Sequence, residues 1–440
     1  MISKSPLFNL QAVLKETTLK ADVLRAWERR YGLPTPQRSS GGHRLYSEYD
    51  IATIKWLRAR QAEGLSISHA VELWNEISGA GQDPLLESLQ LTAAEEPAIQ
   101  ADINRIDMFR TNWLNACLNF DALIAEDIIN QAFALYPVET VCFEILQKGI
   151  HEIGHLWYEN KATVHQEHFA SALAMRRIET LISATPQPTR DQTILVGCPA
   201  GEWHSFPVLL LTLLLRRKGL NVLYLGPNIP LEKMEETAAL VRPDLIILSS
   251  QQLSTASAIH FAALLFQKLH IPLGYGGLVF NRIPELRGKI PAFFLGEKLE
   301  EGIDRIEQLL ASPEPFPEGI LLKGTDDEAA AVFRSKIPLI EATLMEILKE
   351  EGFSFEYMAE VNAYFTAELS AALELGDPRF LEPDLEWVNK LMMDRNLPPN
   401  LLSPYLAAYQ HAVDLAMGES GRVITEWLAS YVTKFSTSTQ

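Results

Sequence analysis

Residues 24–67 read LRAWERRYGLPTPQRSSGGHRLYSEYDIATIKWLRARQAEGLSI, and this stretch decides the fold of the first part of the chain. Its first residues lie in a helix predicted over Lys20–Tyr31, which follows a shorter predicted helix at Leu10–Lys15 and a turn. A hairpin rich in Pro and Gly is predicted over Gly32–Tyr46, and a further helix over Ser47–Glu63. This order of elements is the outline of a winged helix-turn-helix.

Basic side chains on the second helix and on the hairpin make DNA the expected partner of this head. Arginines spaced by four and one residues share one helix face, where guanidinium groups can reach a groove, and basic residues on the hairpin can reach flanking phosphates. Two tyrosines can hydrogen-bond the DNA backbone, whereas Trp27 and Trp56 are expected in the core. A solvated arginine face over core aromatics is the alternative. The candidate DNA-binding residues are Arg25, Arg29, Arg30, Tyr31, Arg38, His43, Arg44 and Tyr46.

Charge is unevenly distributed along the 440 residues. The chain has 38 Lys and Arg against 56 Asp and Glu, a net charge of −18, which argues against a protein that coats nucleic acid along its whole length. Residues 1–75 hold 11 basic and seven acidic side chains, so this head carries +4 and the remainder −22. A basic head on an acidic body is expected if only the head meets phosphate.

The composition, with 47% apolar residues, is that of an ordinary globular protein, and the length predicts about two to four domains. The most apolar stretch, around Val208–Leu215, falls far short of the roughly 20 residues that span a membrane. The beginning of the sequence lacks a signal-peptide pattern, and Cys117, Cys142 and Cys198 have no CxxC spacing. A cytoplasmic protein with inert thiols is therefore expected.

Three stretches rich in Pro, Gly, Ala or acidic residues predict linkers, at Ser78–Asn104, Ala184–Gln192 and Ala311–Glu328. They divide the chain into four predicted domains. These are a winged helix-turn-helix (1–77), a four-helix bundle (105–185), a flavodoxin-like doubly wound α/β domain (192–312) and an all-α tail (328–436).

Apolar residues in the predicted bundle recur at spacings of three and four, the period of amphipathic helices. Its last two helices are joined by a short turn, and Thr163 and Gln166 form a capping pair at the start of the second. The two helices should be antiparallel neighbours. Trp157 at the end of one is therefore expected beside Glu167 and His168 at the start of the next.

The third segment alternates apolar strands with helices, a pattern typical of a parallel sheet covered on both faces. Ligands bind such folds at the carboxyl ends of the strands. The sequence places a GEWH loop (residues 201–204) after the first strand, Ser249 and Ser250 after the third, and Gly276 and Gly277 after the fourth. A lone loop histidine is usually surface, but beside two further strand-end motifs this one is a ligand candidate.

These residues resemble two known families. Residues 24–67 are similar to the DNA-binding domain of MerR-type regulators. The bundle and the α/β block resemble the cobalamin-binding module of CarH-type light-sensing repressors, which also carry a MerR-type head. The sensor motif of that module, Trp, nine residues, then Glu-His, is met by Trp157, Glu167 and His168, and its Glu-x-His loop by Glu202 and His204.

The resemblance implies adenosylcobalamin as cofactor, with cobalt as its metal and His204 as the lower axial ligand. Imidazole suits cobalt, and glycine lets the backbone approach a bulky ligand. The displaced dimethylbenzimidazole base would enter a slot lined by the loops of Ser249, Ser250, Gly276 and Gly277. The residues Trp157, Glu167 and His168 would cover the upper face and cradle the adenosyl group.

Two residues depart from the family pattern. Pro207 stands where the Glu-x-His loop continues to a glycine, although Pro is tolerated in a first helical turn. Tyr158 stands where well-known members have a histidine that takes the cobalt after illumination. A bis-histidine photoproduct would then need His165 or His168. A cobalamin fold that has lost its ligand and senses something else is the alternative.

The tail is predicted to be helical over Ile337–Val432, with amphipathic helices that could enclose an apolar slot. Its segment at residues 373–413, LELGDPRFLEPDLEWVNKLMMDRNLPPNLLSPYLAAYQHAV, resembles the globin-like C-terminal domain of photocobilins, where a bilin binds alongside the cobalamin. Candidate polar contacts for a non-covalent bilin are Arg379, Arg395, Tyr405 and His411; the tail has no cysteine for a thioether. A plain dimerisation or spacer domain is the alternative. The predicted helices are Glu341–Glu351, Glu356–Glu374, Phe380–Arg395 and Asn400–Met417.

The sequence thus predicts a DNA-binding transcriptional repressor controlled by adenosylcobalamin and light. By resemblance, the cofactor in darkness favours a dimer or tetramer that grips operator DNA, and light disperses it. A cobalamin-free MerR-type regulator that senses a bilin or a protein partner is the alternative. A cobalamin mutase or methyltransferase usually needs a barrel of about 250 residues, for which the remaining helical tail has no room, so no enzyme and no catalytic residues are expected. A cobalamin-dependent methyl-transfer protein that acts with a partner enzyme is the less favoured alternative.

Overall fold

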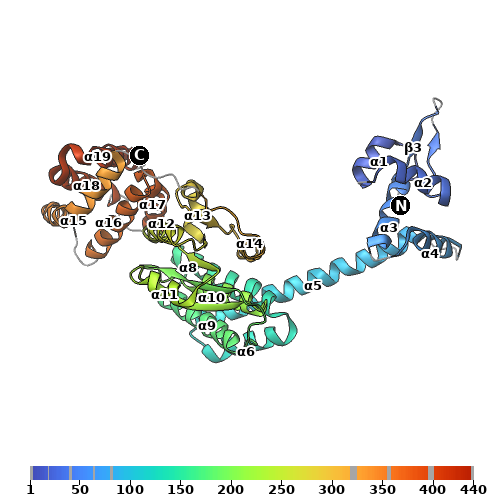
Figure 1. Cartoon of the computed structure of the whole chain (residues 1–440), viewed down its shortest axis with the longest axis horizontal. Helices are drawn as coiled ribbons and strands as arrows, with labels where there is room; N and C mark the ends of the chain where they lie inside the picture. Colours follow the sequence, from blue (N-terminus) through green and yellow to red (C-terminus); the bar gives the residue numbers. More distant parts are fainter. Residues whose placement is uncertain are drawn as a thin grey trace. The chain divides into compact units, whose positions relative to one another are not determined.

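The computed structural model describes residues 3–17, 19–38, 42–62, 65–79, 83–317, 325–353, 358–394 and 401–437. The chain forms two compact units, Met1–Ile106 and Asp107–Gln440, which Figure 1 colours from blue to red along the sequence.

The first unit is a winged helix-turn-helix, as predicted. β1 (Phe8–Asn9) leads into α1 (Leu10–Thr17), and α2 (Ala21–Tyr31) follows after a turn. Gly32 ends α2 at a φ of 69°, in the left-handed region that glycine adopts without steric cost. The wing consists of β2 (Gln37–Arg38) and β3 (Arg44–Tyr46), and the three strands form an antiparallel sheet in the order β1-β3-β2.

The helices α3 (Glu48–Ala62) and α4 (Ile67–Gly79) complete the head. Its core includes Trp27, Trp56 and Trp74, with the rings of the last two 5.2 Å apart, so the expected burial of Trp27 and Trp56 is confirmed. The linker predicted at Ser78–Asn104 is wrong over most of its length, because α5 runs from Pro84 to Leu118. This segment is polar but rich in Leu, Ala, Glu and Gln, which are strong helix formers.

Four helices form the predicted bundle in the second unit: the end of α5, α6 (Ala122–Leu135), a continuous helical stretch from Val138 to Tyr158, and α9 (Val164–Ser183). The third helix consists of α7 (Val138–Thr140), a π-helical turn η1 (Val141–Gln147) and α8 (Lys148–Tyr158). The Thr163 side chain accepts from the Gln166 amide and the Gln166 side chain accepts from the Thr163 amide, so the predicted cap is confirmed.

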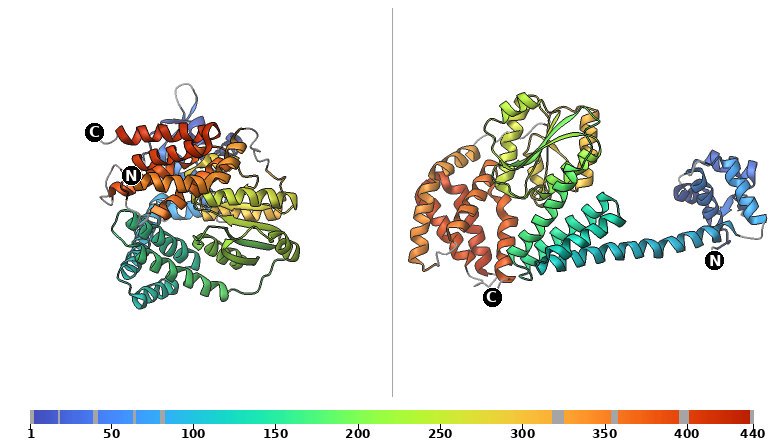
Figure 2. Two further views of the ribbon diagram at one scale, coloured as in Figure 1. Left: turned by 90° about the vertical axis from the view of Figure 1, so that its left-hand side faces the viewer. Right: turned by 90° about the horizontal axis from the view of Figure 1, so that it is seen from below.

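A parallel five-stranded sheet forms the α/β domain, with the order β5-β4-β6-β7-β8. The strand that comes second along the chain lies at the edge and the first lies beside it, which is the flavodoxin-like order. Helices flank both faces of the sheet (Figure 2). The strands are β4 (Thr193–Pro199), β5 (Asn221–Ile229), β6 (Leu245–Ser249), β7 (Leu273–Gly276) and β8 (Phe293–Phe294). The helices are α10 (Phe206–Arg217), α11 (Met234–Val241), α12 (Leu253–Lys268), α13 (Leu278–Arg282), η2 (Pro284–Gly288) and α14 (Leu299–Ala311).

The tail is helical in its described residues, as predicted, and packs on the α/β domain through Ala371, Ala372, Leu375 and Phe380, which join that domain's core. Its first helix begins earlier than the predicted Glu341, so the linker predicted to reach Glu328 is shorter. A globin-like arrangement of the tail stays a prediction. The elements are α15 (Thr325–Glu350), α16 (Met358–Glu374), η3 (Pro378–Leu381), α17 (Glu382–Asp394), α18 (Leu402–Met417), η4 (Gly418–Gly421) and α19 (Arg422–Thr437).

Two further predictions concern the chain as a whole. Within the described ranges, every helix is too short or too polar to be a candidate membrane span. The thiols of Cys117, Cys142 and Cys198 are free and buried, and burial raises the pKa of each to about 12. Thiols of this kind are inert, as expected.

Candidate functional site

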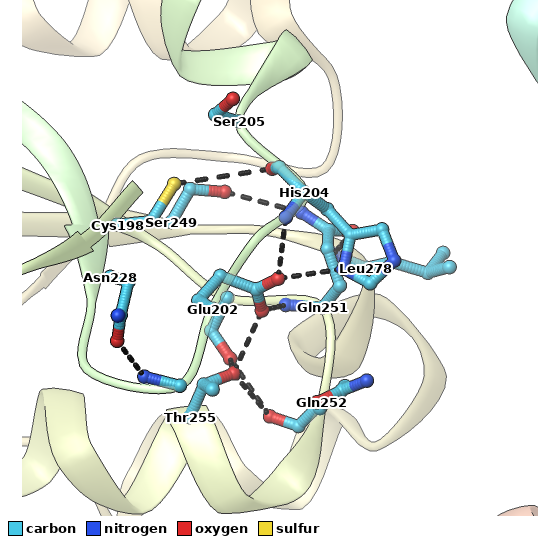
Figure 3. Close-up of polar contacts among 12 residues, drawn as sticks. Cys198, Glu202, His204, Ser205, Asn228, Ser249, Gln251, Gln252, Thr255 and Leu278 are labelled. Carbon is cyan, nitrogen blue, oxygen red and sulfur yellow. Dashed lines mark hydrogen bonds and ion pairs between the residues drawn. The ribbon is translucent and has the colours of Figure 1, made fainter. Parts of the chain in front are cut away.

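The loop that follows β4 holds a glutamate and a histidine in direct contact (Figure 3). The Glu202 side chain is 0% exposed, and its Oε1 accepts from the His204 amide at 3.0 Å and from His204 Nδ1 at 2.7 Å. A carboxylate on Nδ1 fixes the tautomer and the orientation of the ring and leaves the lone pair on Nε2 for a metal. The predicted ligand is therefore oriented by its own sequence neighbour.

The other oxygen of Glu202 is held by the start of α12. Glu202 Oε2 accepts from the Gln251 amide at 2.6 Å and from Thr255 Oγ1 at 2.8 Å. Burial raises the pKa of the Glu202 carboxyl, but hydrogen bonds from His204, Gln251 and Thr255 outweigh burial and hold that pKa below its ordinary value. Glu202 is thus a buried carboxylate that stays ionised.

The imidazole of His204 is open to a ligand, with 61% of its side chain exposed. The hydrogen bond with Glu202 raises the pKa of His204, burial opposes this, and the charges of Glu202 and Glu167 add to the rise. Ser205, the next residue of the loop, contacts α9 of the bundle, with its Oγ 3.7 Å from Met175 Sδ. The structure therefore brings the His204 loop beside the helix that carries Glu167.

The two glycines of the slot predicted at the neighbouring strand ends, Gly276 and Gly277, have different surroundings. Gly277 has a φ of 122°, and a Cβ there would lie 1.9 Å from the Ser250 carbonyl oxygen, so only glycine fits. A Cβ at Gly276 would meet no heavy atom of the described residues within 4 Å. Ser249 and Ser250 are both buried. The two loops thus meet closely at Gly277, whereas the space beside Gly276 is open.

The residues predicted over the upper face are partly brought together. Glu167 Oε1 accepts from Ser171 Oγ at 2.7 Å, and its Oε2 lies 3.7 Å from Nε2 of the exposed His168. The ring of Trp157 lies 6.5 Å, centroid to centroid, from the ring of Trp387 in α17 of the tail. Trp387 of the tail therefore lies beside one of the three residues predicted to cover the upper face, Trp157.

Pro207 and Tyr158 also take defined places. Pro207 lies in the first turn of α10, where its missing N–H costs nothing, so the departure from glycine is accommodated. The Tyr158 ring stacks on Trp387 at 5.6 Å with an interplanar angle of 29°. The position that a histidine holds in well-known members is thus occupied by a tyrosine packed against the tail.

The donor set fits cobalamin. An exposed imidazole with a buried carboxylate on its Nδ1 is the second-shell arrangement that orients metal-bound histidines, and the open space beside Gly276 suits a bulky group near the strand ends. Sequence reasoning missed Gln251, Thr255 and Trp387 as members of this site. The first two follow a strand end, which is a usable signal, whereas the third lies far away in the sequence.

The tail residues predicted to contact a bilin do not share one place. Arg379 is exposed and binds Asp377 through both carboxylate oxygens, at 2.9 to 3.0 Å for Nε and 2.6 Å for Nη2. Tyr405 lies in the tail core and His411 is exposed. Arg395 lies outside the described residues. A common slot formed by the three described side chains is therefore not present.

Most of the predicted DNA-binding residues lie on the surface of the head. Arg25, Arg29, Arg30, Arg38 and His43 are exposed, as a DNA-binding face requires. Three others are engaged within the head. Arg44 Nε donates to Glu28 at 2.7 Å while the arginine stays partly exposed, Tyr31 Oη lies 3.1 Å from Ser68 Oγ, and Tyr46 Oη donates to Glu28 at 2.5 Å.

The prediction that Tyr46 contacts the DNA backbone is wrong. The side chain is fully buried in the head core, and burial together with the Glu28 hydrogen bond raises the pKa of its hydroxyl far above the ordinary value. Its role is to fix the wing strand β3 on α2.

Comparison with known proteins agrees with this geometry. Residues 8–77 match the MerR HTH family of regulatory proteins, and residues 110–182 match a B12 binding domain. The chain is 30% identical over 232 residues to the HTH-type transcriptional repressor CarH of Myxococcus xanthus, covering 53% of this chain and 75% of the relative. It is 28% identical over 242 residues to CarA of the same organism, covering 54% and 75%.

A third relative is the HTH-type transcriptional regulator MlrA of Salmonella typhimurium, 25% identical over 239 residues, covering 42% of this chain and 86% of the relative. All three relatives are named as transcriptional regulators and not as enzymes. The chain, with a MerR-type DNA-binding head followed by a B12-binding domain, belongs to the family of the HTH-type transcriptional repressor CarH.

Proposed function

We propose that this protein is a DNA-binding transcriptional repressor whose grip on operator DNA is set by cobalamin held between the bundle and the α/β domain. The observation that carries the proposal is the Glu202–His204 pair, with Nδ1 of the histidine 2.7 Å from a fully buried carboxylate. The same carboxylate also holds the start of α12 through the Gln251 amide and the Thr255 hydroxyl. The bundle adjoins this loop, with Ser205 Oγ 3.7 Å from Met175 Sδ of α9, which supports a cofactor between the two domains.

In this proposal His204 Nε2 would hold the cobalt of the cofactor, and the open space beside Gly276 would admit the displaced dimethylbenzimidazole tail. When bound, adenosylcobalamin would supply a cobalt–carbon bond that light cleaves. Glu167 would accept hydrogen bonds from the hydroxyl groups of the adenosyl group, and Trp157 would pack against its ring. Glu202 keeps the imidazole in one tautomer throughout.

The adenosyl form, light and assembly complete the proposal. In darkness the loaded protein forms a dimer or tetramer, and illumination disperses it. A head with a net charge of only +4 binds weakly by itself, and joining two or more heads raises avidity by roughly 10²–10⁴. The cytoplasm is the proposed location, because it holds the DNA and keeps free thiols such as those of this chain reduced.

The test is a DNA-binding measurement on the full chain. A duplex selected from a random library by the loaded protein in darkness serves as the operator. We expect adenosylcobalamin in darkness to raise both the particle size, by light scattering, and the affinity for the duplex, and illumination to reverse both. If neither quantity responds to the cofactor or to light, the proposal is wrong.

For the tail, a globin-like fold with a non-covalent bilin stays part of the proposal. Tyr405 Oη and Trp427 Nε1 are buried without a hydrogen-bond partner in the described part of the chain, and unsatisfied polar atoms are the observation that favours a polar occupant. Adding biliverdin to the purified chain should produce a shifted long-wavelength absorption band if the pigment binds. An unchanged pigment spectrum would leave the tail as a dimerisation or spacer domain.

A further inference from the structure

The beginning of α12 receives a second buried carboxylate, which comes from the tail. Glu368 on α16 is 1% exposed, and its Oε2 accepts from the Leu253 amide at 2.9 Å. Its Oε1 accepts from Ser254 Oγ at 2.5 Å, and both oxygens lie 3.3 Å from the Ser254 amide. First-turn amides have no partner inside a helix and favour negative charge. A tail residue therefore caps a helix of the α/β domain.

The two carboxylates share one short segment. Glu202 accepts from the amide of Gln251 and the hydroxyl of Thr255, and Glu368 accepts from the amides of Leu253 and Ser254. Residues 251–255 are thus held on one side by the glutamate that orients His204 and on the other side by the tail. Figure 3 shows the first of these two carboxylates with its partners. Hydrogen bonds at both ends, joined by the backbone of residues 251–255, thus connect α16 to the imidazole.

Further contacts join α16 to α12. Ser257 Oγ donates to Glu374 at 2.5 Å, about one turn further along α12 and nearly two turns further along α16. Arg282 of α13 forms an ion pair with Asp384 of α17, and Phe380 lies in the α/β core. A displacement of the tail would therefore pull on the first turn of α12.

The tail also contacts the bundle. Trp387 of α17 stacks on Tyr158 at the end of α8, and the ammonium group of Lys390 lies 5.5 Å from the centre of the Tyr158 ring. Tyr158 follows Trp157 directly, so this contact reaches the residue proposed to cover the upper face. One domain, the tail, thus touches both walls of the proposed cofactor site.

We propose that Glu368 is a positioning residue of the cobalamin site: through the first turn of α12 it fixes the loop that carries Glu202 and His204, and the tail thereby sets how firmly the protein holds its cofactor. This inference rests on the proposed function. It gives the last part of the chain a task that requires no pigment.

The substitution that tests it is Glu368→Ala, which removes both acceptor oxygens. Leaving the Leu253 and Ser254 amides without this acceptor should increase opening of residues 251–255 on the order of tenfold or more. Glu360→Ala is the matched control, because Glu360 is an exposed glutamate on the same helix. Ser254→Ala removes only the hydroxyl contact and should act in the same direction with a smaller effect.

Two measurements on the full chain test the expected effect of the substitution. The first is amide hydrogen exchange of the cofactor-free protein in peptides covering residues 198–206 and 249–257. We expect Glu368→Ala to accelerate exchange in both peptides, with Glu360→Ala unchanged. The second is the dissociation rate of adenosylcobalamin in darkness, which should rise on the order of tenfold in Glu368→Ala.

The outcomes separate the two hypotheses. Faster exchange confined to residues 249–257 and the tail, with residues 198–206 unaffected, would overturn the inference. So would an unchanged dissociation rate in a variant whose wild-type parent retains the cofactor. A wild-type chain that retains no cobalamin would instead refute the proposed function, and the exchange data would still decide whether the tail reaches the His204 loop.

Discussion

Replacing Glu202 by glutamine probes the centre of the proposed site with little change of shape. The carboxylate accepts four hydrogen bonds, two on each oxygen. The amide that replaces it has one oxygen and one NH₂ group. Whichever way the amide turns, one pair of donors therefore meets a donor instead of an acceptor.

The size of the effect depends on which of the four donors can find another acceptor. If the NH₂ group faces α12, the Thr255 hydroxyl can turn to the Gln252 carbonyl at 3.0 Å, but the Gln251 amide is left without an acceptor. If it faces the loop, neutral His204 can accept at Nδ1, but its backbone amide is left unpaired. Either way one buried backbone donor is lost, at a cost of about 2 kcal/mol, which is roughly a 30-fold increase in local opening.

The assay is amide hydrogen exchange of the cofactor-free full chain in peptides covering residues 198–206 and 249–257. We expect Glu202→Gln to accelerate exchange there by roughly 30-fold and to weaken cobalamin binding, because the ring loses its fixed tautomer. Glu235→Gln, at an exposed position of α11, is the control and should change neither. Exchange within twofold of the wild type would show that the buried carboxylate does not hold the loop, and would refute this reasoning.

Three further predictions concern other parts of the molecule. A Cβ at Gly149 would lie 2.7 Å from the ring of Trp113, so Gly149→Ala should lower the free energy of unfolding by about 1–3 kcal/mol, seen as a lower midpoint of thermal unfolding; an unchanged midpoint would contradict it. Burial raises the pKa of Glu368 to about 7, above its value of about 4.5 in the unfolded chain. The stability of the wild type relative to Glu368→Gln should therefore fall by about 3 kcal/mol between pH 4.5 and pH 7, and urea midpoints whose difference does not vary with pH would refute this. Arg29→Ala should weaken duplex binding by about 1–3 kcal/mol if Arg29 reads a base, or reduce the salt dependence by about one ion if it binds phosphate; unaltered affinity across salt concentrations would exclude Arg29 from the interface.

Much of the architecture could be predicted from the sequence, because it depends on local pattern. The alternation of apolar strands and helices after Thr193 predicted the parallel sheet, and the pair Thr163 and Gln166 predicted the cap that starts α9. The position of Glu202 and His204 at a strand end predicted their place at the edge of the sheet. Such features depend on residues close together in the chain, so the sequence alone is enough to predict them.

The failures share a different cause. An aromatic residue on a wing can face the DNA or the core, and only the buried contact of Tyr46 with Glu28 decides between them. The contact of Glu368 with the start of α12 joins residues 114 and 115 positions apart, and no periodicity predicts such a pair. The early start of α5 reflects helix propensity in a polar segment, which a search for apolar periods overlooks.

The central claim, that His204 holds the cobalt of a bound cobalamin, is tested most directly by the absorption spectrum of the full chain titrated with adenosylcobalamin in darkness. The wild type should bind the cofactor with a spectrum that shows histidine in place of the dimethylbenzimidazole base. His204→Ala should lose that signature and retain the cofactor less well. Identical spectra and identical retention in the two proteins would contradict the claim.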